Sequence, residues 1–168
     1  MSVRERLHRL ENRFYVAIRH PSAGEVADAP LGPAGLDALH HREYCLVVSY
    51  RRNGEPIATP VWFAIDGDRL VFESDADSLK LKRIGRDPTV RVAPCSSRGR
   101  PLAPPAEATA RILDDDEEPA AERALAEKYG WSRTLTSRIR PTSPAGFAYV
   151  EVTAAPKNDE GSASAGPS

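Results

Sequence analysis

The chain has 168 residues and a formal net charge of −1, so it is long enough for one sizeable core and does not have the composition of a nucleic-acid or membrane-surface binder. Its start lacks the apolar core of a signal peptide, and no apolar run approaches the ~20 residues that span a bilayer. Cys45 and Cys95 are too few for a disulfide framework, and they could pair or stay reduced. We expect a cytoplasmic protein with no nucleic-acid and no membrane partner.

An amphipathic helix is expected at residues 3–18, where apolar side chains recur at three- and four-residue spacing. It either covers the protein's own core or docks on a partner subunit. The stretch 20–35 is rich in Pro, Gly, Ala and Ser, which is typical of a linker. We therefore divide the chain into an N-terminal helix and linker, one folded domain and a disordered tail, at 1–35, 36–153 and 154–168.

A succession of strands is predicted from residue 44 onward, where β-branched and aromatic residues alternate with turn signals. Asn53-Gly54 favours a tight hairpin because both central positions of a type I′ turn need a positive φ, and Asp66-Gly67 marks a second turn. The strand at 57–65 is apolar on both faces, so something outside the barrel must cover it, and a subunit interface is one candidate. The expected strands are 44–51, 57–65, 69–73, 89–94, 106–113 and 147–153.

Short helices are expected at 36–41 and 78–86, and a third helix should begin in the acidic run at 114–119 and end near Lys128. Together these elements predict a mainly β protein with flanking helices, a six-stranded antiparallel barrel. The strand spacing alone also admits an OB-fold, which could bind single-stranded nucleic acid, or a sandwich.

A basic stretch follows the central hairpins. From Ser78 to Arg100 there are seven Lys or Arg residues against one acid, Asp87. A hydroxyl and several cations at a helix start suit phosphate, because the first turn of a helix has unpaired N–H donors. The alternative is a solvated basic helix face. The histidines and cysteines have no metal-ligand spacing, and no glycine-rich dinucleotide loop occurs.

An ordered set of motifs resembles the FMN-binding split β-barrel superfamily, which includes pyridoxamine 5′-phosphate oxidase. The closer resemblance is to its branch of F420-dependent oxidoreductases, over roughly residues 36–153. The polar C-terminal tail replaces the arginine- and tryptophan-rich end of the pyridoxamine phosphate oxidases, which argues against pyridoxamine as substrate. The matching motifs are Asn53-Gly54-Glu55-Pro56, Thr-Pro-Val-Trp-Phe at 59–63, Asp66-Gly67, Ser-x-Lys at 78–80, Asp87-Pro88, the stretch 94–102 and Lys-Tyr-Gly at 128–130.

The resemblance implies a homodimeric oxidoreductase that transfers a hydride between reduced F420 and a small unsaturated or quinone-like substrate. The alternatives are an FMN-binding oxidoreductase of the same fold and a non-catalytic barrel that binds a cofactor or haem. No catalytic residue is assigned, although Tyr44, Tyr50 and Tyr129 are candidate acids. The implied cofactor residues are Thr59, Pro60, Val61 and Trp62 along the ring, Ser74 beneath the ring or ribityl chain, Ser78 and Lys80 at the phosphate, and Lys82 and Arg83 at the phosphate or the oligoglutamate tail.

Overall fold

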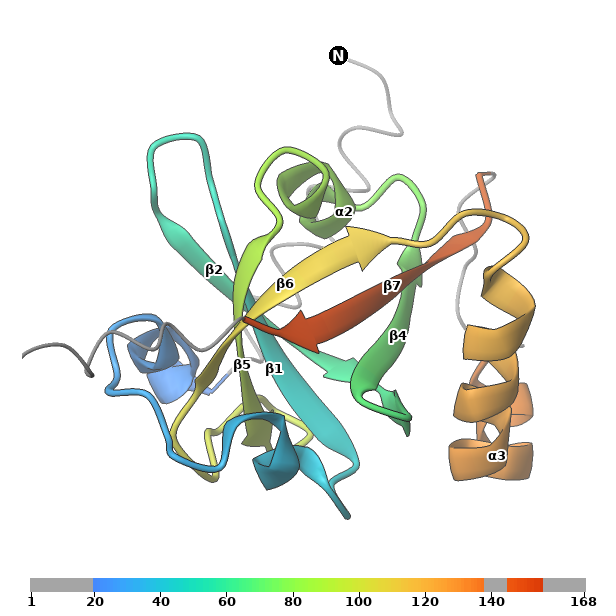
Figure 1. Cartoon of the computed structure of the whole chain (residues 1–168), viewed down its shortest axis with the longest axis horizontal. Coiled ribbons are helices and arrows are strands. Elements are labelled where there is room, and N and C mark those ends of the chain that lie inside the picture. The colour runs from blue at the N-terminus through green and yellow to red at the C-terminus, as the bar shows by residue number, and fades with distance from the viewer. Residues whose placement is uncertain (1–19, 138–144, 156–168) are drawn as a thin grey trace, which may run out of the picture.

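The computed structural model describes residues 20–137 and 145–155, including the side chains of all but 131–137. The helix predicted at 3–18 and the tail from 156 onward lie outside the described residues. An antiparallel seven-stranded sheet, in the order β2-β1-β5-β6-β7-β4-β3, curls into a half barrel (Figure 1). Its strands are β1 Tyr44–Tyr50, β2 Pro56–Trp62, β3 Ala64–Asp66, β4 Arg69–Asp75, β5 Thr89–Cys95, β6 Ala106–Ile112 and β7 Phe147–Ala154.

The mainly β fold class is confirmed, with seven strands in place of six because the strand predicted at 57–65 is interrupted at Phe63. The two halves, β2 and β3, are consecutive in the chain yet form opposite edges of the sheet. The sheet must therefore curl until these edges approach each other. Strand β2 contacts β4 across this junction without being part of the same hydrogen-bonded ladder. The barrel is split at this junction.

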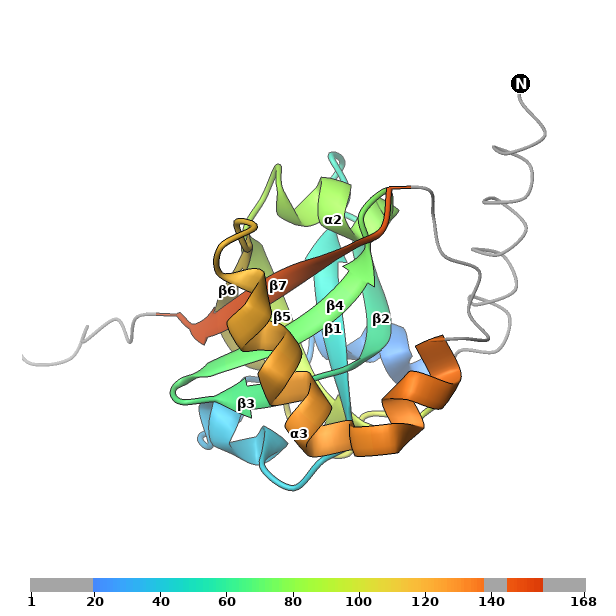
Figure 2. The ribbon, with the colours of Figure 1, turned by 90° about the vertical axis from the view of Figure 1, so that its right-hand side faces the viewer.

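The main core fills the inside of the barrel with alternate residues of the strands, such as Cys45 and Val47 of β1. The short helix α2, Leu79–Ile84, lies across one end of the barrel in Figure 2. Its Leu81 and Ile84 are buried in the same core, so the helix closes that end. Gly85 ends the helix close to the predicted boundary, and Ser78 caps its start.

The outer face of β1 is covered by a segment that composition predicts to be a linker. Residues Pro21–Ala27 form the 3₁₀ helix η1, and its Ala23 and Val26 pack against Leu46 and Val48 of β1. Arg91 of β5 fastens the end of η1, since its Nη1 donates to the carbonyls of Ala27 at 2.5 Å and Ala29 at 3.1 Å. This apolar face is therefore covered within the chain itself, without a second subunit.

A second 3₁₀ helix, η2 Gly35–Leu39, replaces the short helix expected at 36–41. The helix α3, Glu118–Ser137, runs past the predicted end near Lys128 and changes direction at Gly130, whose φ is 51° (Figure 2). Glycine adopts this left-handed backbone conformation without steric cost, so the chain bends there and continues as helix. Leu125 of α3 packs on Ala64 and Val71, outside the barrel.

Both cysteines are buried as free thiols. Cys45 belongs to the core inside the barrel, whereas Cys95 packs on the outer face beside η1. Because their side chains lie on opposite faces of the sheet, they cannot pair. In the described part of the chain, no helix is both long and apolar enough to cross a membrane. The same residues contain no cluster of three or more His, Cys, Asp or Glu side chains suited to a metal ion.

Candidate functional site

Two serines meet where β4 turns into α2. Ser74, only 5% exposed, lies near the end of β4, and its hydroxyl oxygen is 3.0 Å from that of Ser78. The Ser78 oxygen also accepts the N–H of Leu81 at 3.3 Å, which is the N-cap bond of the helix. When Ser74 donates to Ser78, both lone pairs of Ser78 are engaged and its own proton is left to donate outward.

The cations of α2 lie around this pair on different sides of the helix. Lys80 is half-buried, and its Nζ is 5.1 Å from the ring centroid of Phe72 on β4. Arg83 is also half-buried but is directed toward β1, where its Nε donates to the hydroxyl of Ser49 at 2.9 Å. Lys82 is exposed. The structure thus brings Ser74 and Ser78 together and directs Arg83 toward β1, whereas Lys80 contacts Phe72 on β4.

The strand predicted to line the cofactor ring is the edge strand β2. Thr59 and Pro60 are half-buried, Val61 is buried, and Trp62 stacks on Tyr129 at 4.9 Å between ring centroids. Within the described residues, no hydrogen bond or ion pair links this strand to the serine pair. Strand β2 does contact β4, the strand that carries Ser74, across the split of the barrel.

Tyr129 has a role that its position in the sequence does not reveal. Its hydroxyl accepts the N–H of Phe63 at 3.0 Å and lies 2.8 Å from the Phe63 carbonyl oxygen and 2.6 Å from that of Glu43. It therefore satisfies the backbone at the interruption between β2 and β3. The Lys-Tyr-Gly motif was the only sequence signal for this contact.

The candidate acids are poorly suited to proton donation. Burial raises the pKa of Tyr129, whose hydroxyl is already engaged by backbone groups. Tyr50 lies on the outer face of β1 with the η1 cluster, and burial raises its pKa also. Tyr44 meets Trp62 edge-on, with 6.3 Å between ring centroids.

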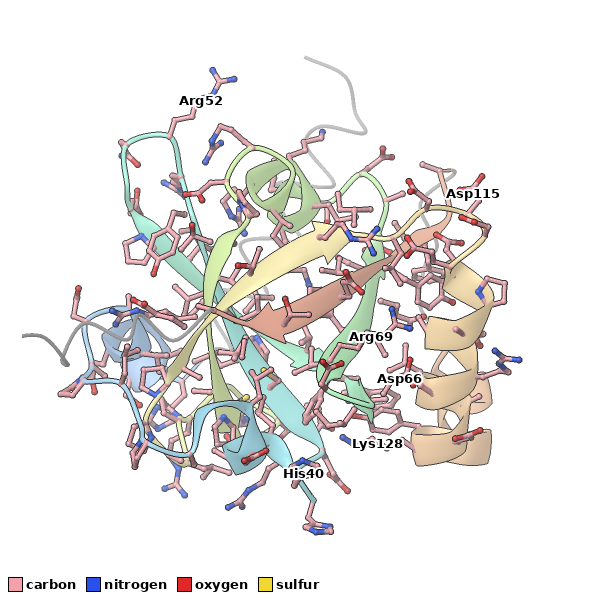
Figure 3. All side chains as sticks on the ribbon, viewed as in Figure 1. His40, Arg52, Asp66, Arg69, Asp115 and Lys128 are labelled. Carbon is pink, nitrogen blue, oxygen red and sulfur yellow. The ribbon has the colours of Figure 1, made fainter. Side chains whose placement is uncertain are left out.

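Lys128 lies beside Tyr129 and contacts the residue at the interruption between β2 and β3. Its Nζ lies 3.6 Å from the ring centroid of Phe63 and donates to the carbonyl of Arg42 at 2.5 Å. Figure 3 shows its side chain at the lower side of the barrel, reaching inward from α3 just before the bend at Gly130. Burial of the amine lowers the pKa of Lys128 to about 8, although much of the side chain is exposed.

The curled antiparallel sheet, closed at one end by a short basic helix with a serine pair at its start, defines a split β-barrel with a candidate anion site. The family model for pyridoxamine 5′-phosphate oxidase matches residues 31–156, and the chain belongs to this family. The resemblance found in the sequence motifs is thereby confirmed.

Solved structures with TM-scores above 0.5 show the same fold at low sequence identity, as the first two below do. HutZ, the haem storage protein of Vibrio cholerae, is 11% identical with a TM-score of 0.54, over 71% of this chain and 87% of its own. A FAD-binding protein from Mesorhizobium loti is 13% identical with a TM-score of 0.51, over 70% and 83%. An F420 reductase is 20% identical with a TM-score of 0.48, over 75% and 97%. A comparison with curated proteins finds no significant match.

Proposed function

We propose that the chain is an F420-dependent oxidoreductase that reduces a small unsaturated or quinone-like substrate, with FMN as the alternative cofactor. Membership of the family and the ordered motifs support this proposal. The observation that carries it is the corner between β4 and α2, where two serine hydroxyls meet and Lys80 lies in the first turn of the helix.

The groups at this corner fit a phosphate. Hydroxyl donors and an ammonium form charge-assisted hydrogen bonds to phosphate oxygens, which are stronger than bonds between neutral groups. Ser74 would orient Ser78, whose proton is available for an anion. Lys80 would supply a compact positive charge, and its contact with the buried ring of Phe72 limits how its side chain can move. Lys82 would reach the same anion from the exposed side of the helix.

The strand from Thr59 to Trp62 would hold the cofactor ring. Because β2 is an edge strand, its backbone groups facing away from β1 are not taken up by a neighbouring strand. Those between Thr59 and Trp62 would hydrogen-bond the polar edge of a planar ring. The Trp62 end of this strand would be held in place, because Trp62 stacks on Tyr129 and Tyr129 hydrogen-bonds to Phe63.

When bound, the deazaflavin would supply the hydride, and the protein would orient the ring and exclude water. We propose a homodimer in which residues 36–153 form the cofactor-binding domain and the second subunit completes the site. Its interface would have to use surfaces other than the outer face of β1, which η1 already covers.

The test is equilibrium binding of the purified protein to F420, FMN and haem side by side, followed by mixing with reduced F420 and a quinone. We expect F420 to bind most tightly and the oxidised cofactor to be regenerated as the quinone is reduced. Tight binding of FMN alone would overturn the F420 assignment. If the protein binds neither F420 nor FMN, both enzyme assignments are overturned.

A further inference from the structure

The 3₁₀ helix η1 covers only part of the outer face of β1 and β2. Cys45 and Val61 belong to the core inside the barrel, so the residues next to them along the two strands point outward. Under η1, the outward residues Leu46 and Val48 are fully buried. Toward the end of β2 three outward residues remain half-buried, and we call them the outer strip: Tyr44, Pro60 and Trp62.

The outer strip is continuous and is flanked by α3. Tyr44 and Trp62 are partners in the β1–β2 ladder, and their rings meet edge-on with 6.3 Å between centroids. Pro60 lies two residues before Trp62, on the same face of β2. Tyr129 of α3 stacks on Trp62 with 4.9 Å between ring centroids. An apolar sheet face is stabilised when another apolar element packs on it.

The chain that precedes η1 enters the described part of the structure beside this strip. The N–H of His20 donates to the carbonyl of Arg98 at 2.7 Å. Arg98 lies three residues after Cys95, the last residue of β5, and Cys95 pairs with Tyr44. Trp62 is two strands away from Cys95, which is about 10 Å at the usual spacing between strands. Residues upstream of His20 therefore begin close to the strip.

The direction of η1 supports this placement. At its far end Arg91 holds the carbonyl of Ala27, and Arg91 pairs with Val48. Val48 is four residues from Tyr44, about 13 Å along a strand. The seven residues of η1 span about 14 Å as a 3₁₀ helix. Because the two lengths agree, η1 lies along β1 and its start is at the Tyr44 end.

The sequence upstream of His20 has an apolar stripe of suitable length. The helix expected at 3–18 lies outside the described residues, and as a helix its 16 residues would be about 24 Å long. Only Arg19 separates it from His20, so the end of the stripe nearest to η1 would start within reach of Trp62. The stripe consists of Val3, Leu7, Leu10, Phe14 and Ile18.

We propose that residues 3–18 dock on the outer strip of their own chain through this stripe. The single-residue connection to His20 gives the segment a high effective concentration at its own strip. Docking extends the cover that η1 provides and holds Trp62 against Tyr129, at the junction where the barrel is split. A second copy of the chain is the other candidate occupant of the strip. The docking involves no cofactor and does not depend on the proposed function.

Trp62 reports on this contact in the full chain. The chain has two tryptophans, so Trp131→Phe leaves Trp62 as the only one. In that background Leu10→Asp places a charge in the stripe, and Asn12→Asp is the matched control because it adds the same charge on the opposite face of the expected helix. We expect Leu10→Asp to shift the emission to the red and to make acrylamide quenching more efficient. Asn12→Asp should match the parent.

Equal quenching in all three proteins, or an equal increase in the two aspartate variants, overturns the docking. A urea titration followed by circular dichroism shows whether the barrel of each variant is folded. If Trp131→Phe does not fold, Leu10→Asp and Asn12→Asp are compared in the parent chain by limited trypsin digestion. Cleavage at Arg9 and Arg13 should then be faster in Leu10→Asp than in Asn12→Asp, and equal rates overturn the docking.

A mixing experiment identifies the chain that supplies the segment. One protein combines Leu10→Asp with Trp131→Phe and keeps Trp62 as the reporter. The other keeps the segment intact but carries Trp62→Phe and Trp131→Phe, so it does not contribute tryptophan emission. The two are unfolded together in urea and refolded. Docking within one chain leaves the reporter as exposed as it is alone, whereas restored protection of Trp62 means that a second copy supplies the segment and overturns the proposal.

Discussion

The hydroxyl oxygen of Tyr129 lies 3.0 Å from the backbone nitrogen of Phe63, the residue between β2 and β3. Phe63 belongs to neither strand, so its N–H has no partner in a sheet ladder. The hydroxyl of Tyr129, on α3, therefore accepts the hydrogen bond that a neighbouring strand would otherwise accept. This contact ties the junction at which the barrel is split to the helix outside it.

Tyr129→Phe should lower the free energy of unfolding by about 1–3 kcal/mol, because it leaves a buried backbone donor unsatisfied. Urea denaturation followed by fluorescence measures the loss. Tyr149→Phe is the control, since the hydroxyl of Tyr149 donates to Glu122 at an exposed position and its removal should cost less. Equal losses in the two variants would show that Tyr129 has no special role at the junction.

Lys128 should make stability rise with pH in the alkaline range. The pKa of Lys128 is about 8 in the folded chain and near the ordinary lysine value of 10.5 in the unfolded chain. Below pH 8, Lys128 is protonated in both the folded and the unfolded chain, and its partly buried charge destabilises the folded state in full. Between about 8 and 10.5 only the unfolded state binds it, so folding becomes more favourable as pH rises.

Lys128→Met should abolish this rise, measured as the difference in urea midpoint between the two proteins from pH 7.5 to 10.5. Lys82→Met, at an exposed position on α2, should follow the wild type. A Lys128 variant whose midpoint keeps the same pH dependence as the wild type would contradict the lowered pKa.

Lys80→Ala should weaken cofactor binding by about 10- to 100-fold, which corresponds to the loss of one charge-assisted hydrogen bond of about 1.5–3 kcal/mol. The thermal midpoint should change little, because the core residues Leu81 and Ile84 of α2 are untouched. Lys82→Ala should have a smaller effect on affinity. If Lys82→Ala weakens binding more than Lys80→Ala, the phosphate is held by the other lysine.

The two thiols should be inert in the folded protein. Burial raises the pKa of Cys95 to about 12, and burial likewise raises that of Cys45. A disulfide reagent at pH 8 should label neither thiol in buffer and both in 6 M guanidinium, because the thiolate is the reactive form. Rapid labelling of the native protein would show that one of these sites opens readily.

Local chemistry made much of the fold predictable. The hairpin at Asn53-Gly54 and the alternating strands around it depend on neighbours in the sequence, and β1 and β2 pair there in the expected antiparallel arrangement. The expected type I′ turn is wrong, because Gly54 has a positive φ of 81° and Asn53 does not. The interruption at Phe63 could not be foreseen, because residues 57–65 read as one continuous apolar strand. The group that satisfies its backbone is 66 residues away.

The candidate site likewise contains one contact between residues close in sequence and one between residues far apart. The approach of Ser74 to Ser78 follows from a tight turn, in which the N–H of Ser78 donates to the carbonyl of Asp75 at 2.9 Å. Such a turn is a local feature. The contact of Arg83 with Ser49 spans 34 residues and depends on how α2 is laid across the barrel. Sequence reasoning therefore placed Arg83 with the other cations of the helix.

The 3₁₀ helix η1 has a consequence for where the folding unit of this chain begins. The family match starts at residue 31, downstream of η1. A fragment cut at that boundary would retain every strand, yet Leu46, Val48 and Ala58 would lose the side chains that cover them. Such a fragment would expose the apolar outer face of β1 and β2 to solvent and tend to aggregate. The smallest soluble unit should therefore start before Pro21, ten residues upstream of the family boundary.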